Sequence, residues 1–299
     1  MYRVFKKLSF LNYKDNAFYP QIAYINIDFS ITYKVIKYLC NMISKAIIKF
    51  VHSLELKKNR NRERLFVAEG PKVVTDLATV VRPKLIIATP EWLTQHHAEI
   101  QLWEDTQVCE VTEEELRKTS FLKHPQQVMA LFPMREEPTT PSFSALPSHQ
   151  LCLALDDIQD PGNLGTIIRI ADWFGIEHIF CSKETADVYN PKVVQATMGS
   201  IARVQLHYTD LHQLITALPS ETPIYGTLLD GQNIYTQELT SHGLIVMGNE
   251  GNGISPDIRK LVTRRLLIPN YPSDRVCAES LNVAIATAIT CAEFRRKTS

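Results

Sequence analysis

The sequence of 299 residues lacks clustered cysteines, an excess of charge of either sign and an abundance of glycine. Its six cysteines lie far apart, with no Cys-x-x-Cys pair and no His/Cys cluster. We therefore expect no disulfide framework, no metal site and a reducing, cytoplasmic location. With 11 Gly and 16 Pro, the chain is neither collagen-like nor of low complexity. Its 45% hydrophobic content and zero net charge exclude disorder as the main state.

A secretory pattern and a membrane-spanning run are also missing. The most apolar stretch, residues 31–51, is interrupted by four lysines. A spanning helix needs roughly 20 nearly uninterrupted apolar residues. We therefore expect no contact with a membrane.

The zero net charge hides an asymmetry between the two ends of the chain. Residues 1–64 hold 13 Lys+Arg against four Asp+Glu, which leaves 19 against 28 for residues 65–299. The densest basic segment spans residues 57–64. A basic N-terminal segment followed by an acidic remainder of the chain predicts that the N-terminal segment contacts a polyanion. A solvated helix face explains the same segment about equally well.

The first 41 residues differ from the rest in composition. They hold six of the 11 Tyr and no Gly, and Met42 then opens an amphipathic helical pattern that runs to Val51. We expect that Met42 is the natural start and that residues 1–41 are an upstream extension. An N-terminal helix or anchor is the alternative.

The remaining sequence predicts two domains joined by a linker. A typical domain has about 150 residues, which agrees with this division. Residues 138–150 are rich in Pro, Ser and Thr and read as a linker. Before them, residues 42–137 alternate short apolar runs with helical patterns, as in a small α/β domain. After them, residues 151–299 contain repeated apolar runs separated by helical patterns, which predicts a mostly parallel sheet covered by helices.

A first cluster of polar residues follows the predicted strand 151–155. The sequence Asp-Pro-Gly-Asn-Leu-Gly-Thr-Ile-Ile-Arg spans residues 160–169, where Asp160 or Asn163 can cap the helix that follows. Apolar residues at i, i+3, i+4 and i+7 face the core, and Arg169 lies off that stripe. Polar groups at the carboxyl end of such a strand can reach a ligand crevice. A plain cap for Asn163 and a surface ion pair for Arg169 are the alternatives.

Two further clusters follow later strands. Residues 244–255 run from an apolar strand into Gly248, Gly251 and Gly253, a spacing that differs from a dinucleotide fingerprint. Residues 266–289 run from a strand through Pro269 into an apolar helix that has Glu279–Asn282 at its start. Because the helix is apolar all round, we expect it to be buried on all sides. An ordinary tight turn and a capped core helix are the alternatives.

Taken in order, the three clusters closely resemble the motifs of the SpoU/TrmH family. Its members are RNA ribose 2′-O-methyltransferases of the SPOUT class. The resemblance covers about residues 150–295 and includes the segment Asp187–Ser200 between the first two motifs. Residues 62–70 and 125–130 resemble the L7Ae-like substrate-binding domain that many members carry.

The resemblance implies an α/β SPOUT fold, with helices on both faces of a mostly parallel sheet and a C-terminal trefoil knot. It also implies that S-adenosylmethionine binds among three loops. The residues that it assigns to the cofactor are Thr227, Leu228, Gly248, Asn249, Gly253, Ile268, Pro269 and Leu281. The family often has a Gly soon after Ile-Pro, and residues 270–278 lack one.

The catalytic set that the resemblance implies is Asn163, Arg169, Glu250, Ser280 and Asn282. Asn163 and Arg169 match residues placed at the reacting hydroxyl and the RNA phosphate, and the other three organise the pocket. Arg169 is a proposed base or a phosphate clamp. We favour the clamp, because an arginine side chain stays protonated.

The expected partners are RNA and a second copy of the chain, as family members are commonly homodimers that pack through the knotted domain. For RNA contact we expect Lys57, Lys58, Arg60, Arg62, Arg64 and Lys123, with His124 beside them. Large-subunit ribosomal RNA is the favoured substrate. A tRNA ribose methyltransferase and a non-catalytic RNA-binding assembly factor are the alternatives.

Overall fold

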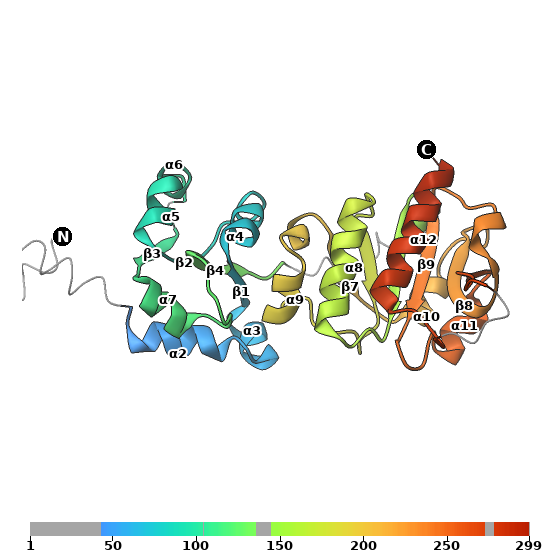
Figure 1. The fold of residues 1–299 in the computed structure, drawn as a ribbon, viewed down its shortest axis with the longest axis horizontal. Helices are drawn as coiled ribbons and strands as arrows, with labels where there is room; N and C mark the ends of the chain where they lie inside the picture. The colour runs from blue at the N-terminus through green and yellow to red at the C-terminus, as the bar shows by residue number, and fades with distance from the viewer. Residues whose placement is uncertain (1–42, 104, 136–144, 273–277, 299) are drawn as a thin grey trace, which may run out of the picture. The chain divides into compact units, whose positions relative to one another are not determined.

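The computed structural model describes residues 43–103, 105–135, 145–272 and 278–298. The expectations for residues 1–41, for linker residues 138–144 and for residues 273–277 lie outside these described residues. The described residues belong to one compact unit with a four-stranded and a six-stranded sheet (Figure 1). No helix within these ranges is long and apolar enough to cross a membrane.

The four-stranded sheet is formed by the N-terminal part of the chain. Its order is β1-β4-β2-β3, with β4 antiparallel to β1 and β2, and β2 parallel to β3. The strands are β1 (Leu65–Glu69), β2 (Leu85–Ala88), β3 (Gln107–Glu110) and β4 (Val128–Pro133). The apolar runs predicted β1, β2 and β4. They did not predict β3, because this edge strand is exposed or half-buried and has no apolar run.

Helices cover both faces of this sheet. They are α2 (Lys45–Ser53), α3 (Lys57–Glu63), α4 (Pro71–Ala78), α5 (Pro90–Gln95), α6 (His97–Gln101) and α7 (Glu113–Thr119). Side chains of α4 and α5 enter one hydrophobic core, and those of α2 and α7 enter another. A capping box of Thr112 and Glu115 starts α7 by satisfying two free backbone amides.

The six-stranded sheet has the strand order β10-β8-β9-β5-β6-β7, and all of its strand pairs are parallel. The strands are β5 (Leu151–Asp156), β6 (His178–Cys181), β7 (Gln205–Tyr208), β8 (Ile224–Asn233), β9 (Gly243–Gly248) and β10 (Arg264–Leu267). The central strands β5 and β9 are buried along nearly their whole length, as expected for parallel strands covered on both faces. The expectation of a mostly parallel α/β fold is confirmed.

The covering helices divide between the faces of the six-stranded sheet. On one face lie α8 (Pro161–Trp173), α9 (Pro191–Ala196) and α12 (Val283–Thr298), with α8 beside α12 (Figure 1). On the other face lie α10 (Leu211–Thr216) and α11 (Pro256–Leu261). Within the described ranges three short 3-10 helices complete the fold, namely η2 (Leu146–Ser148), η3 (Ser200–Ala202) and η4 (Ile234–Thr236).

Two details differ from the sequence expectations or extend beyond them. The helix α12 is not buried on all sides, because the Ile285 side chain is 53% exposed. The strand β10 crosses β8 closely, since a Cβ on Gly231 would lie 2.5 Å from the backbone carbon of Leu266. The trefoil knot that the resemblance implies stays a prediction.

The two sheets share one hydrophobic core. Phe66 of β1 packs on the ring of Tyr189, which precedes α9, with 4.7 Å between the ring centroids. The Tyr189 hydroxyl accepts a hydrogen bond from the amide of Arg135, and the Arg135 guanidinium donates to three carbonyls of residues 201–204. These contacts fix the N-terminal part of the chain against the β6–α9 region.

Candidate active site

The predicted motifs meet at the carboxyl edge of the six-stranded sheet. The chain leaves β5 toward β6 on one side, whereas β9 pairs with β5 on the other. Crevices at such a reversal of strand order are where open α/β sheets bind ligands. The first motif follows β5 and the second follows β9, so both lie at this position.

The sequence left open whether Asp160 or Asn163 caps α8, and the structure assigns the cap to Asp160. The Asp160 carboxylate accepts the Asn163 backbone amide at 2.7 Å and so caps α8. The Asn163 side chain is therefore available for other contacts. Its Nδ2 donates to Oε1 of Glu250 at 2.6 Å, although 87 residues separate them. Glu250 is exposed, so this hydrogen bond positions its carboxylate and does not compensate for burial.

The third motif joins the same network through Asn282. Its Nδ2 donates to Oδ1 of Asn163 at 2.9 Å. Its own Oδ1 accepts the backbone amides of Ala284 and Ile285, and so caps the first turn of α12. The structure therefore brings three of the five predicted catalytic residues into one chain of side-chain hydrogen bonds, which fixes the orientation of the Asn163 amide.

The glycine-containing second motif folds as a closed hairpin. Asn249 and Gly253 exchange both backbone hydrogen bonds, at 3.0 and 2.9 Å. Oδ1 of Asn249 accepts the amides of Gly251 and Asn252, and its Nδ2 donates to the carbonyl of Asp157 at 2.8 Å. The hairpin that carries Glu250 is thereby tied to the end of β5.

Gly248 lies where no side chain fits. A Cβ there would be 2.2 Å from the backbone of Gly253 and Ile254, which is closer than real Cβ contacts. Parallel pairing of Gly226 with Val246 brings Thr227 and Leu228 to the same edge as Gly248, and the Thr227 hydroxyl donates to the Val246 carbonyl at 3.3 Å.

The other residues predicted for the cofactor lie in segments that reach this edge. Ile268 and Pro269 follow β10 and are half-buried. Leu281 is 50% exposed and precedes α12 beside Asn282. Bare backbone next to apolar side chains is a suitable surface for a nucleoside that carries an alkyl chain, and these residues fit such a group.

Arg169 and Ser280 stand apart from the hydrogen-bond network. Arg169 is exposed on α8, six residues after Asn163, a spacing that turns it about 120° around the helix axis at about 3.6 residues per turn. Within the described ranges its guanidinium has no protein ion pair, so the predicted surface ion pair is not formed. Ser280 is exposed in the segment before α12.

The sequence analysis missed two residues that support the site. The buried carboxylate of Asp156 accepts the Ser255 amide at 2.7 Å and so fixes the end of the second motif. The Ser182 hydroxyl accepts the Asp157 amide at 3.0 Å. An acidic residue at the end of an apolar strand was the available signal for Asp156. No local pattern marked Ser182, which directly follows β6.

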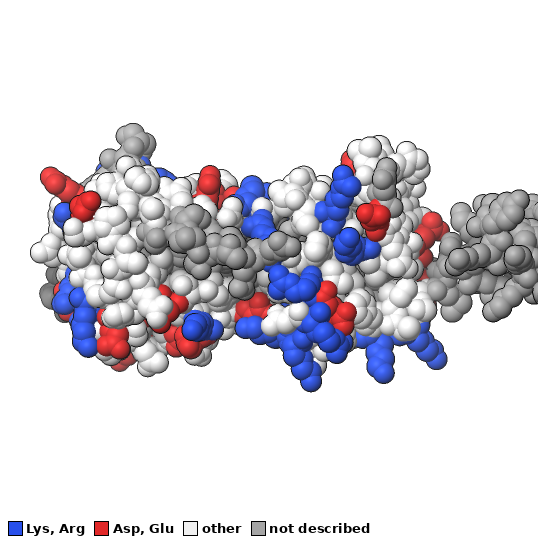
Figure 2. Space-filling model, turned by 180° about the vertical axis from the view of Figure 1, so that it is seen from behind, with Lys and Arg blue, Asp and Glu red and all other residues white. Residues whose placement is uncertain are grey.

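The expected RNA contacts divide into exposed residues and one buried residue. Lys57, Lys58, Arg62, Arg64 and Lys123 are exposed. Figure 2 shows Lys and Arg side chains gathered toward the bottom of its view, where α2 and α3 lie. Arg62 pairs with the neighbouring Glu63 at 2.7 Å, and the Arg64 guanidinium donates to the carbonyl of Arg135.

The prediction that Arg60 contacts RNA is wrong. Its side chain is 2% exposed and forms an ion pair of 2.6 Å with Asp187, which is 13% exposed. The guanidinium also donates to the carbonyls of Leu54 and Glu55. A side chain enclosed in this way is not accessible to a phosphate. Its role is to hold α3 against the segment between β6 and α9.

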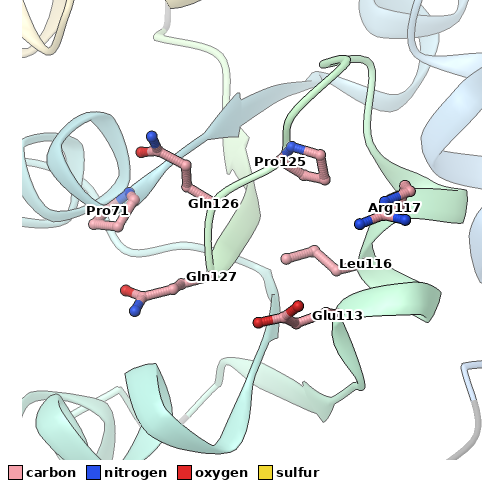
Figure 3. A pocket seen from close by; sticks show the side chains of 7 residues that line it. All are labelled: Pro71, Glu113, Leu116, Arg117, Pro125, Gln126 and Gln127. Atoms are coloured by element: carbon pink, nitrogen blue, oxygen red, sulfur yellow. The ribbon is translucent and has the colours of Figure 1, made fainter.

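A cavity of about 400 Å³ lies in the N-terminal part, away from the network described above. Figure 3 shows side chains from α4, α7 and the segment before β4 around it; its lining residues are Pro71, Glu113, Leu116, Arg117, Pro125, Gln126 and Gln127. The nearby Glu69 carboxylate accepts hydrogen bonds from the Ser120 hydroxyl and the Phe121 amide, which fix the segment after α7. Burial raises the pKa of the Glu69 carboxyl, and these hydrogen bonds oppose the shift.

Buried cysteines offer no reactive thiol. Burial raises the pKa of Cys152 and of Cys291 to about 12, and it also raises the pKa of the fully buried Cys181. A nucleophilic cysteine requires a lowered pKa and access to solvent. Among the described residues no group of three or more His, Cys, Asp or Glu could hold a metal ion.

Comparison with known proteins agrees with this geometry. Residues 150–292 match the SpoU rRNA Methylase family, and residues 45–130 match the MRM3-like substrate binding domain. The chain is 29% identical over 252 residues to the 23S rRNA (guanosine(2553)-2′-O)-methyltransferase RlmP of Bacillus subtilis (strain 168), covering 83% of this chain and 95% of that protein.

Solved structures share the fold over most of this chain. A TrmH-family structure from Porphyromonas gingivalis superposes with a TM-score of 0.73 and 39% identity, covering 86% of this chain and 99% of that one. The AdoMet-bound rRNA methyltransferase from Sinorhizobium meliloti gives a TM-score of 0.72 and 30% identity, covering 84% and 95%.

Proposed function

The chain belongs to the SpoU/TrmH family of RNA methyltransferases, and we propose that it methylates a ribose 2′-hydroxyl of large-subunit ribosomal RNA with S-adenosylmethionine as donor. The observation that carries this proposal is the hydrogen-bonded chain of Glu250, Asn163 and Asn282. It joins all three motifs at the carboxyl edge of the sheet. The ribosomal substrate is supported by the names of the relatives RlmP and RlmB and of the mitochondrial rRNA methyltransferase 3.

S-adenosylmethionine, when bound, supplies an electrophilic methyl group on a sulfonium. Gly248, Ile268 and Leu281 would hold it through backbone groups and apolar side chains, with Thr227, Leu228 and Pro269 beside them. The hairpin closed by Asn249 and Gly253 keeps the Gly248 backbone in place, since Asn249 ties it to Asp157.

Asn163 is the residue that we assign to the reacting hydroxyl. One of its two Nδ2 hydrogens is directed to Glu250, and one lone pair of its Oδ1 is occupied by Asn282. The remaining hydrogen and lone pair can orient a 2′-hydroxyl for in-line attack. Orientation of this kind is worth up to about 7–11 kcal/mol of a reaction barrier in favourable cases.

Arg169 is assigned to the RNA phosphate next to the reacting ribose. Its exposed guanidinium, without a protein ion pair among the described residues, can bind a phosphate in the bidentate manner that arginine favours. Glu250 and Asn282 are positioning residues for Asn163. Ser280 lies in the segment that leads to Asn282 and is assigned to the same pocket.

In this proposal the protein is a homodimer located in the cytoplasm. The adjacent helices α8 and α12 expose large apolar side chains, with Trp173 84% and Ile285 53% exposed. The two helices run in the same direction, since Asn282 contacts Asn163 and Arg295 contacts Phe174. Trp173 and Ile285 therefore lie at opposite ends of the helix pair, and a second copy that covers the length of both helices would bury the two side chains. Arg169 lies one helical turn before Trp173, so a dimer formed here would place the site close to the interface.

The test is transfer of labelled methyl from S-adenosylmethionine to RNA isolated from cells that lack this protein, resolved by size. Label in the large ribosomal RNA, lost in Asn163→Ala and Arg169→Ala, is the expected result. Label in the tRNA band would replace the substrate by tRNA. If no RNA is labelled and a titration shows no donor binding, the protein is an RNA-binding factor and the enzymatic proposal fails.

A further inference from the structure

The segment 182–190 between β6 and α9, together with the first turn of α9, connects the active site to the basic helix α3. At its start, Ser182 accepts the Asp157 amide at 3.0 Å, and the Thr185 hydroxyl donates to the Leu155 carbonyl at 3.2 Å. The Ala186 amide then donates to the carbonyl of Ile158 at 2.8 Å. This end of the segment is therefore fixed to the connection between β5 and α8, which leads to Asn163.

The other end of the segment is fixed to α3. Asp187 receives the buried Arg60 guanidinium at 2.6 Å, and its Oδ1 also accepts the Tyr189 amide at 3.1 Å. Figure 1 shows α9 between α3 and α8, in agreement with the packing of α9 against both β1 and α8. Because Gly165 of α8 leaves no room for a Cβ against Ala196, α8 and α9 are in close contact.

Exposed lysines line this connection at both ends. Lys183 follows Ser182, and Lys192 lies in the first turn of α9, with Lys57 and Lys58 on α3. Within the described ranges none of these four side chains forms an ion pair with the protein. The carboxylate of Asp187 is already neutralised by Arg60, which leaves Glu55 and Glu184 as the nearest exposed acidic side chains along the chain.

We propose that Lys183, Lys192, Lys57 and Lys58 form one track that binds the phosphate backbone of the RNA substrate and leads it from α3 to the ribose at Asn163. The inference rests on the proposed function, and it assigns Lys183 and Lys192 as phosphate contacts. Lysines act as point charges toward phosphates without reading the base sequence. The Arg60–Asp187 ion pair holds the two ends of the track at a fixed separation.

The test compares the full-length protein with the double variant Lys183→Gln/Lys192→Gln. Binding to large-subunit ribosomal RNA from cells lacking this protein is measured at several salt concentrations. Each lost phosphate contact lowers the slope of log K against log salt by about 0.7–0.9 in magnitude. We expect a loss of about 1.4–1.8 for the double variant. S-adenosylmethionine binding and the melting temperature stay unchanged.

Lys118→Gln is the matched control, because Lys118 is 60% exposed on α7 and, among the described residues, its one ion pair is with the exposed Glu114. The proposed track is overturned if the salt slope of the double variant equals that of the wild type. It is also overturned if the slope falls no more than it does in Lys118→Gln. If the slope falls as expected but the wild type methylates no RNA, the track stands and the enzymatic proposal fails. In the active enzyme, kcat/KM falls while kcat at saturating RNA is unchanged, because neither lysine touches the reacting atoms.

Discussion

The guanidinium of Arg60 and the carboxylate of Asp187 form a buried ion pair of 2.6 Å across 127 residues of sequence. Breaking a buried pair leaves one charge without a partner in the interior, which costs about 3–5 kcal/mol. We therefore expect Arg60→Met to lower the free energy of unfolding by about 3 kcal/mol in urea titrations. Arg62→Gln is the control, since the Arg62 side chain is 69% exposed and its ion pair is worth less than about 1 kcal/mol.

The double variant Arg60→Met/Asp187→Leu separates charge from packing. It removes both charges and should recover most of the lost stability, because an apolar pair of similar volume can replace a buried ion pair. If Arg60→Met is as stable as the wild type, the ion pair does not hold the two regions together.

Asn282→Ser tests the orientation of Asn163. Serine retains a cap for the first turn of α12, but it is too short to donate to Asn163 Oδ1 as Asn282 does at 2.9 Å. We expect kcat to fall about 100-fold, as for other small losses of reacting geometry, with little change in melting temperature. Single-turnover methylation measures the effect. Wild-type rates in this variant would show that Asn163 needs no support from Asn282.

Gly248→Ala and Gly251→Ala form a matched pair in the same hairpin. A Cβ at Gly248 would lie 2.2 Å from backbone atoms of Gly253 and Ile254, whereas a Cβ at Gly251 would meet only the Asn249 side chain, at 3.5 Å. We expect Gly248→Ala to destabilise the fold by about 1–3 kcal/mol and to weaken S-adenosylmethionine binding at least about tenfold. Gly251→Ala should resemble the wild type in calorimetric titration. Equal affinities in both variants would contradict the assigned cofactor site.

The histidine pair of β6 and β7 predicts loss of stability in acid. His178 and His207 lie 3.0 Å apart through their ring nitrogens. Burial, together with the neighbouring His178 and Arg135, lowers the pKa of His207 to about 4. Folding therefore favours the neutral ring, so this stability is present above about pH 6.5 and is lost as the pH falls toward 4. For a partly solvated ring we expect about 1–2 kcal/mol.

Comparing the wild type with His207→Asn isolates the contribution of His207 to the loss of stability in acid. Urea titrations at pH 7.5 and pH 5 should show a smaller loss of stability in the variant than in the wild type. An equal loss in both proteins would assign the acid sensitivity to other groups.

Trp173→Glu tests the proposed dimer. Trp173 is 84% exposed on α8, and aromatic side chains at the centre of an interface often contribute about 2 kcal/mol or more. We expect the dissociation constant of the dimer to rise about 30-fold, measured by sedimentation velocity. Leu102→Glu is the control, because Leu102 is 71% exposed in the N-terminal part of the chain. A wild-type monomer, or an unchanged dimer in Trp173→Glu, would refute this interface.

The sequence by itself determined much of the fold and of the motif positions. Apolar runs at short intervals marked most of the strands, because parallel strands buried on both faces must be apolar throughout. The apolar stripe on α8 was confirmed, with Leu164, Ile167, Ile168 and Ala171 all fully buried. The resemblance of the ordered motifs to the SpoU/TrmH family singled out Asn163, Glu250 and Asn282, and the structure joins their side chains by hydrogen bonds.

Only the tertiary structure decided which polar groups meet. Residues 163, 250 and 282 are brought together by strand order, and a local pattern cannot encode contacts across such sequence separations. The same applies to Ser182 at Asp157 and to the Asp187 partner of Arg60. The basic segment 57–64 showed charge alone. Burial turned Arg60 from a predicted RNA contact into a structural ion pair, because the environment of a charged side chain depends on what packs around it.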